Sequence, residues 1–195
     1  MVEPLRSDFA KYTYADVLDW PEEERWELID GVAYDMTPAP SIRHQVILRA
    51  LFRQFDRALE GSPCQTFFAP VDIRLPKPGE DGLTASTVVQ PDLAVICDRE
   101  KLDDHGVVGS PTLVIEILSP STAKKDRQLK MVVYAQAGVP EYWMVSPSEK
   151  TVEVYQLREQ GQYGIPQAIY QYNEQVPVGV LSELVIDLAP VFAEE

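Results

Sequence analysis

Cysteine and histidine are scarce in this sequence of 195 residues, which has only two of each. Cys64 and Cys97 lie in separate apolar segments, and neither has a second cysteine or a histidine at the short spacing that zinc ligands share. A zinc site is therefore not expected, and both cysteines are predicted to be buried free thiols. His105 lies in a polar connection and is expected to be solvated.

Long apolar runs are missing as well. None reaches the roughly 20 residues that a membrane-spanning helix needs. The first 20 residues contain no basic segment followed by an apolar one, which is the pattern of an export signal. We therefore expect no contact with a membrane and a cytoplasmic location.

Positive charge is limited, because 17 lysines and arginines stand against 31 acidic residues and give a formal net charge of −14. Broad, charge-driven binding of nucleic acid depends on lysine and arginine to neutralise phosphates. The overall charge argues against such a surface and leaves room only for a local basic patch.

Several common enzyme motifs are also absent. The segment GEDG, residues 79–82, lacks the spacing of a Walker phosphate loop, and the chain has neither a nucleophile elbow nor a dinucleotide-binding fingerprint. Repeats, low-complexity tracts and linker-like segments are missing too. One domain over residues 1–195 is predicted, with residues 1–12 as a loose arm.

The N-terminal third predicts two helices and a hairpin. Thr13, with Asp16 three residues later, is a variant of the capping box and predicts a short helix that ends near Pro21. Two strand-like runs flank Asp30-Gly31 and predict a hairpin over residues 25–36. Apolar residues at helical spacing then predict a long helix over residues 41–61: Ile47, Leu48, Leu51, Phe55, Ala58 and Leu59.

The rest of the chain predicts a mixed α/β sheet. Residues 63–76, 88–98 and 111–118 are strand-like, and the first of these is predicted to be one extended strand. A helix over residues 123–138 and a strand at 141–146 would complete a parallel crossover. The helix is expected to bury a set of five residues: Leu129, Val132, Val133, Ala135 and Ala137. More strands follow towards the C-terminus.

Two of the apolar strands each carry one acid, Asp92 and Glu116. A buried carboxylate is costly unless it is paired or binds a cation, and two neighbouring carboxylates repel one another. Hard cations such as Mg²⁺ remove that penalty. The alternative is that both acids end at the rim of the sheet, solvated or salt-bridged. Ser119-Pro120 predicts that the second strand ends just after Glu116. Open α/β sheets have their sites at the carboxyl ends of strands, so this position favours a functional role for the acid.

Three segments carry a resemblance to a known family. QPDLAVICD, LVIEILSPST and DRQLKMVVYAQAGVPEYWMV together resemble the Uma2 family, also called DUF820, which is similar to the PD-(D/E)XK nuclease superfamily. The match extends upstream through ELIDG and covers most of residues 13–157. The resemblance implies a restriction endonuclease-like mixed β-sheet flanked by helices, with an N-terminal hairpin and a strand-rich C-terminal extension.

The resemblance also assigns roles to residues. Pro91-Asp92 matches the first acid of the nuclease pattern and Glu116 the second, but Leu118 stands where the pattern has its lysine. In some such nucleases the following helix supplies the lysine. Lys130 is the candidate, because it borders the apolar face of the predicted helix; the alternative is a surface lysine.

Three further side chains are candidates. Glu27 matches an early glutamate of the family and is expected to be the third carboxylate of the site; the alternative is an exposed acid of the hairpin. His44 lies at the start of the apolar face of the long helix, pointing inward, with a structural and a catalytic role equally open. Asp72 is a further candidate, on the strand expected beside Asp92.

The resemblance implies hydrolysis of phosphodiester bonds in nucleic acid, most simply DNA, by a homodimer. Mg²⁺ or Mn²⁺ would be held by Asp92, Glu116, the backbone carbonyl of Ile117 and Glu27, with Lys130 acting beside them. Two alternatives stay open. One is a nuclease fold that has lost activity and serves in binding or assembly, as the −14 charge and Leu118 favour. The other is a metal-dependent hydrolase of a small phosphate ester.

Overall fold

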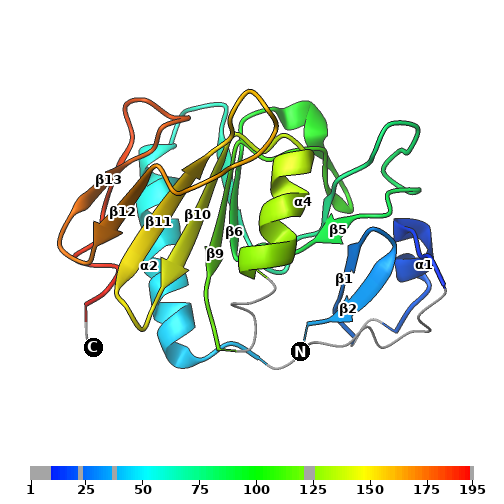
Figure 1. Cartoon of the computed structure of the whole chain (residues 1–195), viewed down its shortest axis with the longest axis horizontal. Coiled ribbons are helices and arrows are strands. Elements are labelled where there is room, and N and C mark those ends of the chain that lie inside the picture. The colour runs from blue at the N-terminus through cyan, green and yellow to red at the C-terminus, as the bar shows by residue number, and fades with distance from the viewer. Residues whose placement is uncertain (1–9, 22–23, 37–38, 121–125, 194–195) are drawn as a thin grey trace.

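The computed structural model describes residues 10–21, 24–36, 39–120 and 126–193. Two six-stranded sheets lie side by side, and Figure 1 shows the central sheet with helices in front of and behind it and the second sheet towards the N-terminal elements. The fold class is the mixed α/β architecture expected from the sequence.

The central sheet has the strand order β12-β11-β10-β9-β6-β3. Strands β9 and β10 are parallel, as the crossover predicts, and the other neighbouring pairs are antiparallel. Its strands are β3 (Gln65–Phe68), β6 (Leu93–Ile96), β9 (Leu113–Ile117), β10 (Glu141–Ser146), β11 (Thr151–Gln156) and β12 (Ala168–Gln171).

The second sheet has the order β2-β1-β5-β4-β8-β7 and begins with the predicted hairpin. Asp30 and Gly31 both have positive φ, of 53° and 79°, which is the conformation a two-residue hairpin turn of this sequence adopts. Its strands are β1 (Trp26–Ile29), β2 (Val32–Asp35), β4 (Ile73–Arg74), β5 (Val88–Val89), β7 (Leu102–Asp103) and β8 (Gly106–Val108). A separate pair, β13 (Gln175–Pro177) and β14 (Val185–Asp187), follows near the C-terminus.

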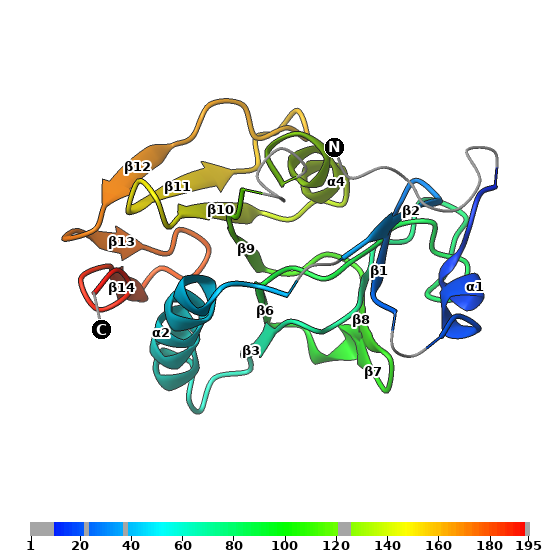
Figure 2. The same cartoon turned by 90° about the horizontal axis from the view of Figure 1, so that it is seen from below.

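Helices cover both faces of the central sheet (Figure 2). Helix α2 (Ile42–Ala58) packs its apolar stripe on one face together with β13 and β14. On the other face lie a π-helical turn, η2 (Asp126–Lys130), and helix α4 (Met131–Gln136). Helix α1 (Tyr14–Leu18) begins with the predicted capping box, and a 3₁₀ turn, η1 (Arg99–Lys101), precedes β7. None of the helices in the described ranges is long and apolar enough to cross a membrane.

The predicted strand over residues 63–76 is wrong as a single element. The chain leaves the central sheet after β3, passes through the cis bond between Ala69 and Pro70, and enters the second sheet as β4. Asp72 therefore precedes β4, which pairs with β5 and β8, and does not lie on β3, the strand that pairs with β6 beyond Asp92.

The prediction of free thiols is also wrong, because Cys64 and Cys97 form a disulfide. The register of β3 and β6 explains the pairing. Gln65 lies opposite Ile96, so the next residues outward along these antiparallel strands, Cys64 and Cys97, face each other. The two cysteines are partly rather than fully buried.

Two of the residues predicted to be buried on the helix over residues 123–138 are exposed. Val133 and Ala135 are buried, but Leu129 and Val132 are 39% and 51% exposed. The helix begins with the π-helical turn η2, which widens the chain at Leu129, so a face drawn at 3.6-residue spacing is rotated there. The start of the predicted helix, residues 123–125, lies outside the described residues.

Two tyrosines of the C-terminal region, Tyr155 and Tyr163, pack inside the chain, while Tyr172 is exposed. Tyr155 and Tyr163 are 5% and 2% exposed, and their rings lie 6.2 and 5.8 Å from that of Tyr142. These residues form part of the core between α4 and the central sheet rather than a free aromatic surface.

Candidate active site

The two acids meet at one edge of the central sheet. Asp92 directly precedes β6 and Glu116 lies near the end of β9, and these strands are antiparallel with Leu93 opposite Ile115. The start of one strand therefore lies beside the end of the other. The Ile117 backbone N–H donates a hydrogen bond of 2.7 Å to Asp92 Oδ2, which fixes the first acid against the strand that carries the second.

Glu116 is buried, with 3% exposure, and is held by two donors from the helix that follows. Lys130 Nζ lies 2.9 Å from Glu116 Oε1, and the Tyr134 hydroxyl donates to the same oxygen at 2.7 Å. Burial, followed by the negative charge of Glu116, raises the pKa of Tyr134 well above its usual value. Tyr134 therefore stays protonated and remains a donor.

Lys130 lies inside the protein, at 3% exposure, and not on its surface. Its Nζ is also 2.8 Å from Oε1 of Glu27, a residue of β1 with no exposed surface. The same Glu27 oxygen accepts a hydrogen bond of 2.9 Å from the backbone N–H of Gln90. The lysine thus joins one carboxylate from each sheet.

His44 extends from the first turn of α2 towards Asp92. Ser41 caps the helix by accepting a hydrogen bond from the backbone N–H of His44. The side chain is 9% exposed, and its Nε2 lies 3.2 Å from Asp92 Oδ2. The inward direction predicted for His44 is confirmed, and its partner is the first acid.

These groups border a cleft of about 310 Å³. Its lining includes Asp92, Glu116, Ile117, His44 and Lys130. Lysine, histidine and carboxylates around a concave site give the combination of cation-binding and anion-binding groups that phosphoryl chemistry uses.

Leu118 explains why the lysine has to come from elsewhere. Its side chain is 8% exposed and packs in the core beside Val133 and Tyr134, while its backbone N–H bonds to the carbonyl of Val145. The position expected for the motif lysine is therefore part of the hydrophobic core, and the ammonium group at Glu116 belongs to Lys130.

Two other predicted positions lie away from Glu116. Asp72 accepts hydrogen bonds from the Tyr14 hydroxyl at 3.0 Å and from Gln90 Nε2 at 2.8 Å. Gln90 lines the cleft, so Asp72 is linked to the cleft through the side chain of Gln90. His105 is exposed in the turn between β7 and β8, as expected.

Sequence reasoning missed Tyr134, Gln90 and Arg25. Tyr134 is four residues after Lys130, so helical spacing alone places the two side chains on one face. Gln90 directly precedes Pro91-Asp92; its side-chain oxygen accepts from Arg25 at 2.6 and 3.1 Å. No local pattern marks Arg25, which directly precedes β1 of the second sheet.

The donor set fits a divalent cation of the hard type. Asp92, Glu116 and the Ile117 carbonyl are oxygen donors of the kind Mg²⁺ and Mn²⁺ prefer, and Mg²⁺ usually keeps several waters beside one or two carboxylates. With Glu27 included, three carboxylates and one lysine give a formal charge of −2, which a divalent ion balances. In the described ranges no group of three or more His, Cys, Asp or Glu is placed to share one ion. Direct ligation of the ion by Glu27 stays a prediction, because Oε1 of its carboxylate contacts Lys130 Nζ and the backbone N–H of Gln90.

The chain resembles other proteins over nearly its whole length. It is 28% identical over 158 residues to "Uncharacterized protein slr1290" of Synechocystis, a match that covers 80% of this chain and 79% of the relative. A crystal structure of "a putative nuclease belonging to DUF820" from Anabaena variabilis superposes with a TM-score of 0.70 at 21% identity and covers 93% of this chain and 97% of that one. The model of the Uma2 family, described as "Putative restriction endonuclease", matches residues 14–189. This protein therefore belongs to the Uma2 family and has the fold of the Anabaena protein.

Proposed function

We propose that this protein is a Mg²⁺- or Mn²⁺-dependent endonuclease that hydrolyses phosphodiester bonds in nucleic acid, and that DNA is its substrate. The observation that carries the proposal is that Asp92 and Glu116 line one cleft at the same end of β6 and β9, with buried Lys130 bonded to Glu116. Membership of the Uma2 family supports the reaction class, since the family description names a restriction endonuclease.

Asp92, Glu116 and the Ile117 carbonyl would hold the ion, which would supply Lewis-acid stabilisation of the negative charge that develops on the phosphate. The Ile117 N–H orients Asp92, and Tyr134 orients Glu116, so both carboxylates are fixed in place before an ion binds. Such preorganisation avoids reorienting the ligands during the reaction.

Lys130 provides a positive charge at the scissile phosphate. Its two carboxylate partners hold the ammonium group in place, and the loss of Glu116 to an ion would leave Glu27 as its anchor. In that position Lys130 can donate a hydrogen bond to a phosphate oxygen or to the attacking water. His44 lines the same cleft, and its Nε2 contact with Asp92 would help to orient that carboxylate.

The test is cleavage of end-labelled single-stranded and duplex DNA in Mn²⁺, Mg²⁺ and EDTA. We expect cleavage only with a metal ion, and a loss of at least about 100-fold in Glu116→Gln and Asp92→Asn, because one preorganised electrostatic interaction is worth roughly this factor. A matched control is Glu183→Gln, which changes an exposed acid that does not line the cleft. Activity that survives Glu116→Gln contradicts the assignment. Turnover of bis(p-nitrophenyl) phosphate without any cleavage of DNA points instead to a small-ester hydrolase.

A further inference from the structure

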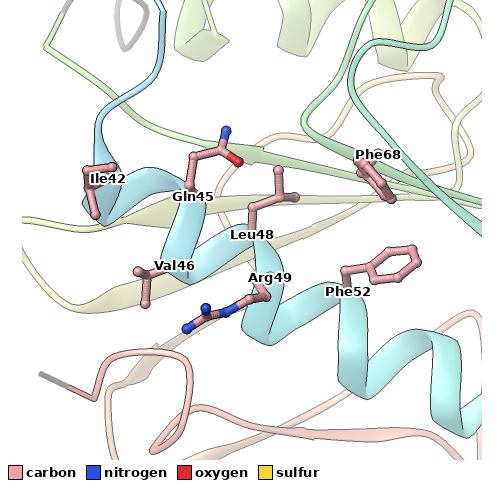
Figure 3. A pocket seen from close by; sticks show the side chains of 7 residues that line it. All are labelled: Ile42, Gln45, Val46, Leu48, Arg49, Phe52 and Phe68. Atoms are coloured by element: carbon pink, nitrogen blue, oxygen red, sulfur yellow. The ribbon is translucent and has the colours of Figure 1, made fainter. Parts of the chain in front are cut away.

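A second hollow, of about 500 Å³, lies directly beside the catalytic cleft. Gln45 and Leu48 of α2 line both of them, so the two hollows adjoin along the helix. Figure 3 shows Leu48 projecting towards Phe68, which comes from the end of β3, and Phe52 projecting to the same side further along α2. We call this hollow the α2 groove.

The α2 groove presents aromatic and aliphatic surface to solvent. Phe68 is 50% exposed and Ile42 81% exposed. The rings of Phe52 and Phe68 meet edge to face with centroids 4.9 Å apart, which holds the Phe68 ring in a defined orientation. A large apolar side chain that is both ordered and exposed beside a catalytic cleft is suited to contact a ligand.

Positive charge is concentrated on the same helix. Helix α2 carries four arginines and a single acid, Asp56, in a chain whose net charge is −14. Arg49, Arg53 and Arg57 recur at intervals of four residues and are all exposed, so they form one row along the helix. Arg49 also lines the α2 groove, and all three line a neighbouring hollow of about 330 Å³. The net charge of α2 is thus opposite to that of the whole protein and complementary to a phosphate backbone.

We propose that the α2 groove and the arginine row bind an unpaired strand of nucleic acid, with a base stacked on Phe68 and the backbone along Arg49, Arg53 and Arg57. Binding of single strands combines a basic track with exposed aromatic rings on which bases stack. The bases of an intact duplex are already stacked on one another and offer no face to a protein ring. This proposal rests on the nuclease function, and it narrows the substrate to single-stranded or locally opened nucleic acid.

The first test is fluorescence anisotropy with a labelled 12-nucleotide single strand and the matching duplex, in EDTA so that no cleavage occurs. Phe68→Ala is expected to weaken binding of the single strand about tenfold, as loss of one stacked base does, and to change duplex binding less than twofold. Ile169→Ala is the matched control, because Ile169 is 54% exposed on β12, away from α2, and it should bind as the wild type does.

The second test is the salt dependence of the same binding. Arg53→Ala should reduce the slope of log K against log salt by about 0.7, which is the value for one phosphate contact to a single strand. Arg158→Ala, which removes an exposed arginine outside α2, should leave the slope unchanged. An unchanged slope in Arg53→Ala would contradict the proposal that the arginine row contacts the phosphates of the strand.

Three results separate this proposal from its rivals. Equal binding and equal cleavage by wild type and Phe68→Ala would overturn it and leave the nuclease function standing. A wild-type protein that neither binds nor cleaves any strand would overturn both. A dimer in sedimentation velocity that Phe68→Ala dissociates, with strand binding intact, would show that a second copy of the chain occupies the α2 groove.

Discussion

Replacement of Lys130 by methionine tests the arrangement of the site without any assay of activity. The variant keeps most of the volume of the side chain and removes its charge. Lys130 Nζ lies 2.8 Å from Glu27 Oε1 and 2.9 Å from Glu116 Oε1, and these two carboxylates are 0% and 3% exposed. Without the lysine, two buried acids lose their shared cation.

The expected cost is about 3–5 kcal/mol in the free energy of unfolding, which is the range for removing one partner of a buried ion pair. The cost comes mainly from carboxylates that are left desolvated and uncompensated. The exposed pair of Lys77 with Asp30 gives the comparison, since its side chains are 46% and 58% exposed. Lys77→Met should cost less than about 1 kcal/mol, because water screens that pair.

The assay is urea denaturation at pH 7 in EDTA, for the wild type, the two single variants Lys130→Met and Glu27→Gln, and their double variant. We expect the double variant to be more stable than Lys130→Met by at least about 1 kcal/mol, because one of the two uncompensated charges is gone; contacting residues commonly couple by this much or more. A cost below about 1 kcal/mol for Lys130→Met, or strictly additive effects, would refute the buried bridge.

Three other predictions use the same denaturation assay. Tyr134→Phe should lower the free energy of unfolding by about 2 kcal/mol, because a hydrogen bond to the buried carboxylate of Glu116 is lost; an effect below about 0.5 kcal/mol would contradict that bond. Burial raises the pKa of Glu141 above its usual value, so its contribution to stability is present below about pH 4.5 and is lost as the pH rises through the folded-state pKa. The stability of Glu141→Gln relative to the wild type should therefore increase from pH 4.5 to pH 8, and parallel pH profiles would show that this carboxyl is not perturbed. The disulfide of Cys64 and Cys97 closes a loop over a separation of 33 residues, so dithiothreitol should lower wild-type stability by about 3–4 kcal/mol and leave the double serine variant unchanged; an equal response of both proteins would contradict the bond.

Local patterns were sufficient for several elements. The capping box of α1, the Asp30-Gly31 hairpin and the helical spacing of α2 each depend on residues close in sequence, and the structure confirms all three. The two acids could be selected for a related reason. A carboxylate within an apolar strand is costly, so the pattern itself marks Asp92 and Glu116 as positions that need a partner.

Features that depend on distant pairing could not be derived in this way. The disulfide follows from the register of β3 and β6, which neither segment specifies alone. Glu27 could equally have been an exposed hairpin acid, and only the contact between β1 and the region of Lys130 determines that it is buried. The departure of the chain from the central sheet before Asp72 is likewise a property of both sheets together.

The buried face predicted for the helix over residues 123–138 is wrong for a different reason. The prediction assumes a constant period of 3.6 residues, and the π-helical turn η2 breaks that period. The same turn carries Lys130, which bonds to Glu116. The irregular turn in which Leu129 is exposed therefore lies at the candidate active site. π-Helical turns are often found at functional sites, and here the turn carries the lysine that the position of Leu118 lacks.

The most direct test of the proposed metal site is calorimetric titration of the purified protein with Mn²⁺ at pH 7.5, compared with Asp92→Asn and Glu116→Gln. The account predicts binding of Mn²⁺ at the cleft by the wild type, at least tenfold weaker binding by either variant, and competition by Mg²⁺. The absence of Mn²⁺ binding to the wild type, or equal binding by all three proteins, would contradict the claim that these two carboxylates form the metal site of a nuclease.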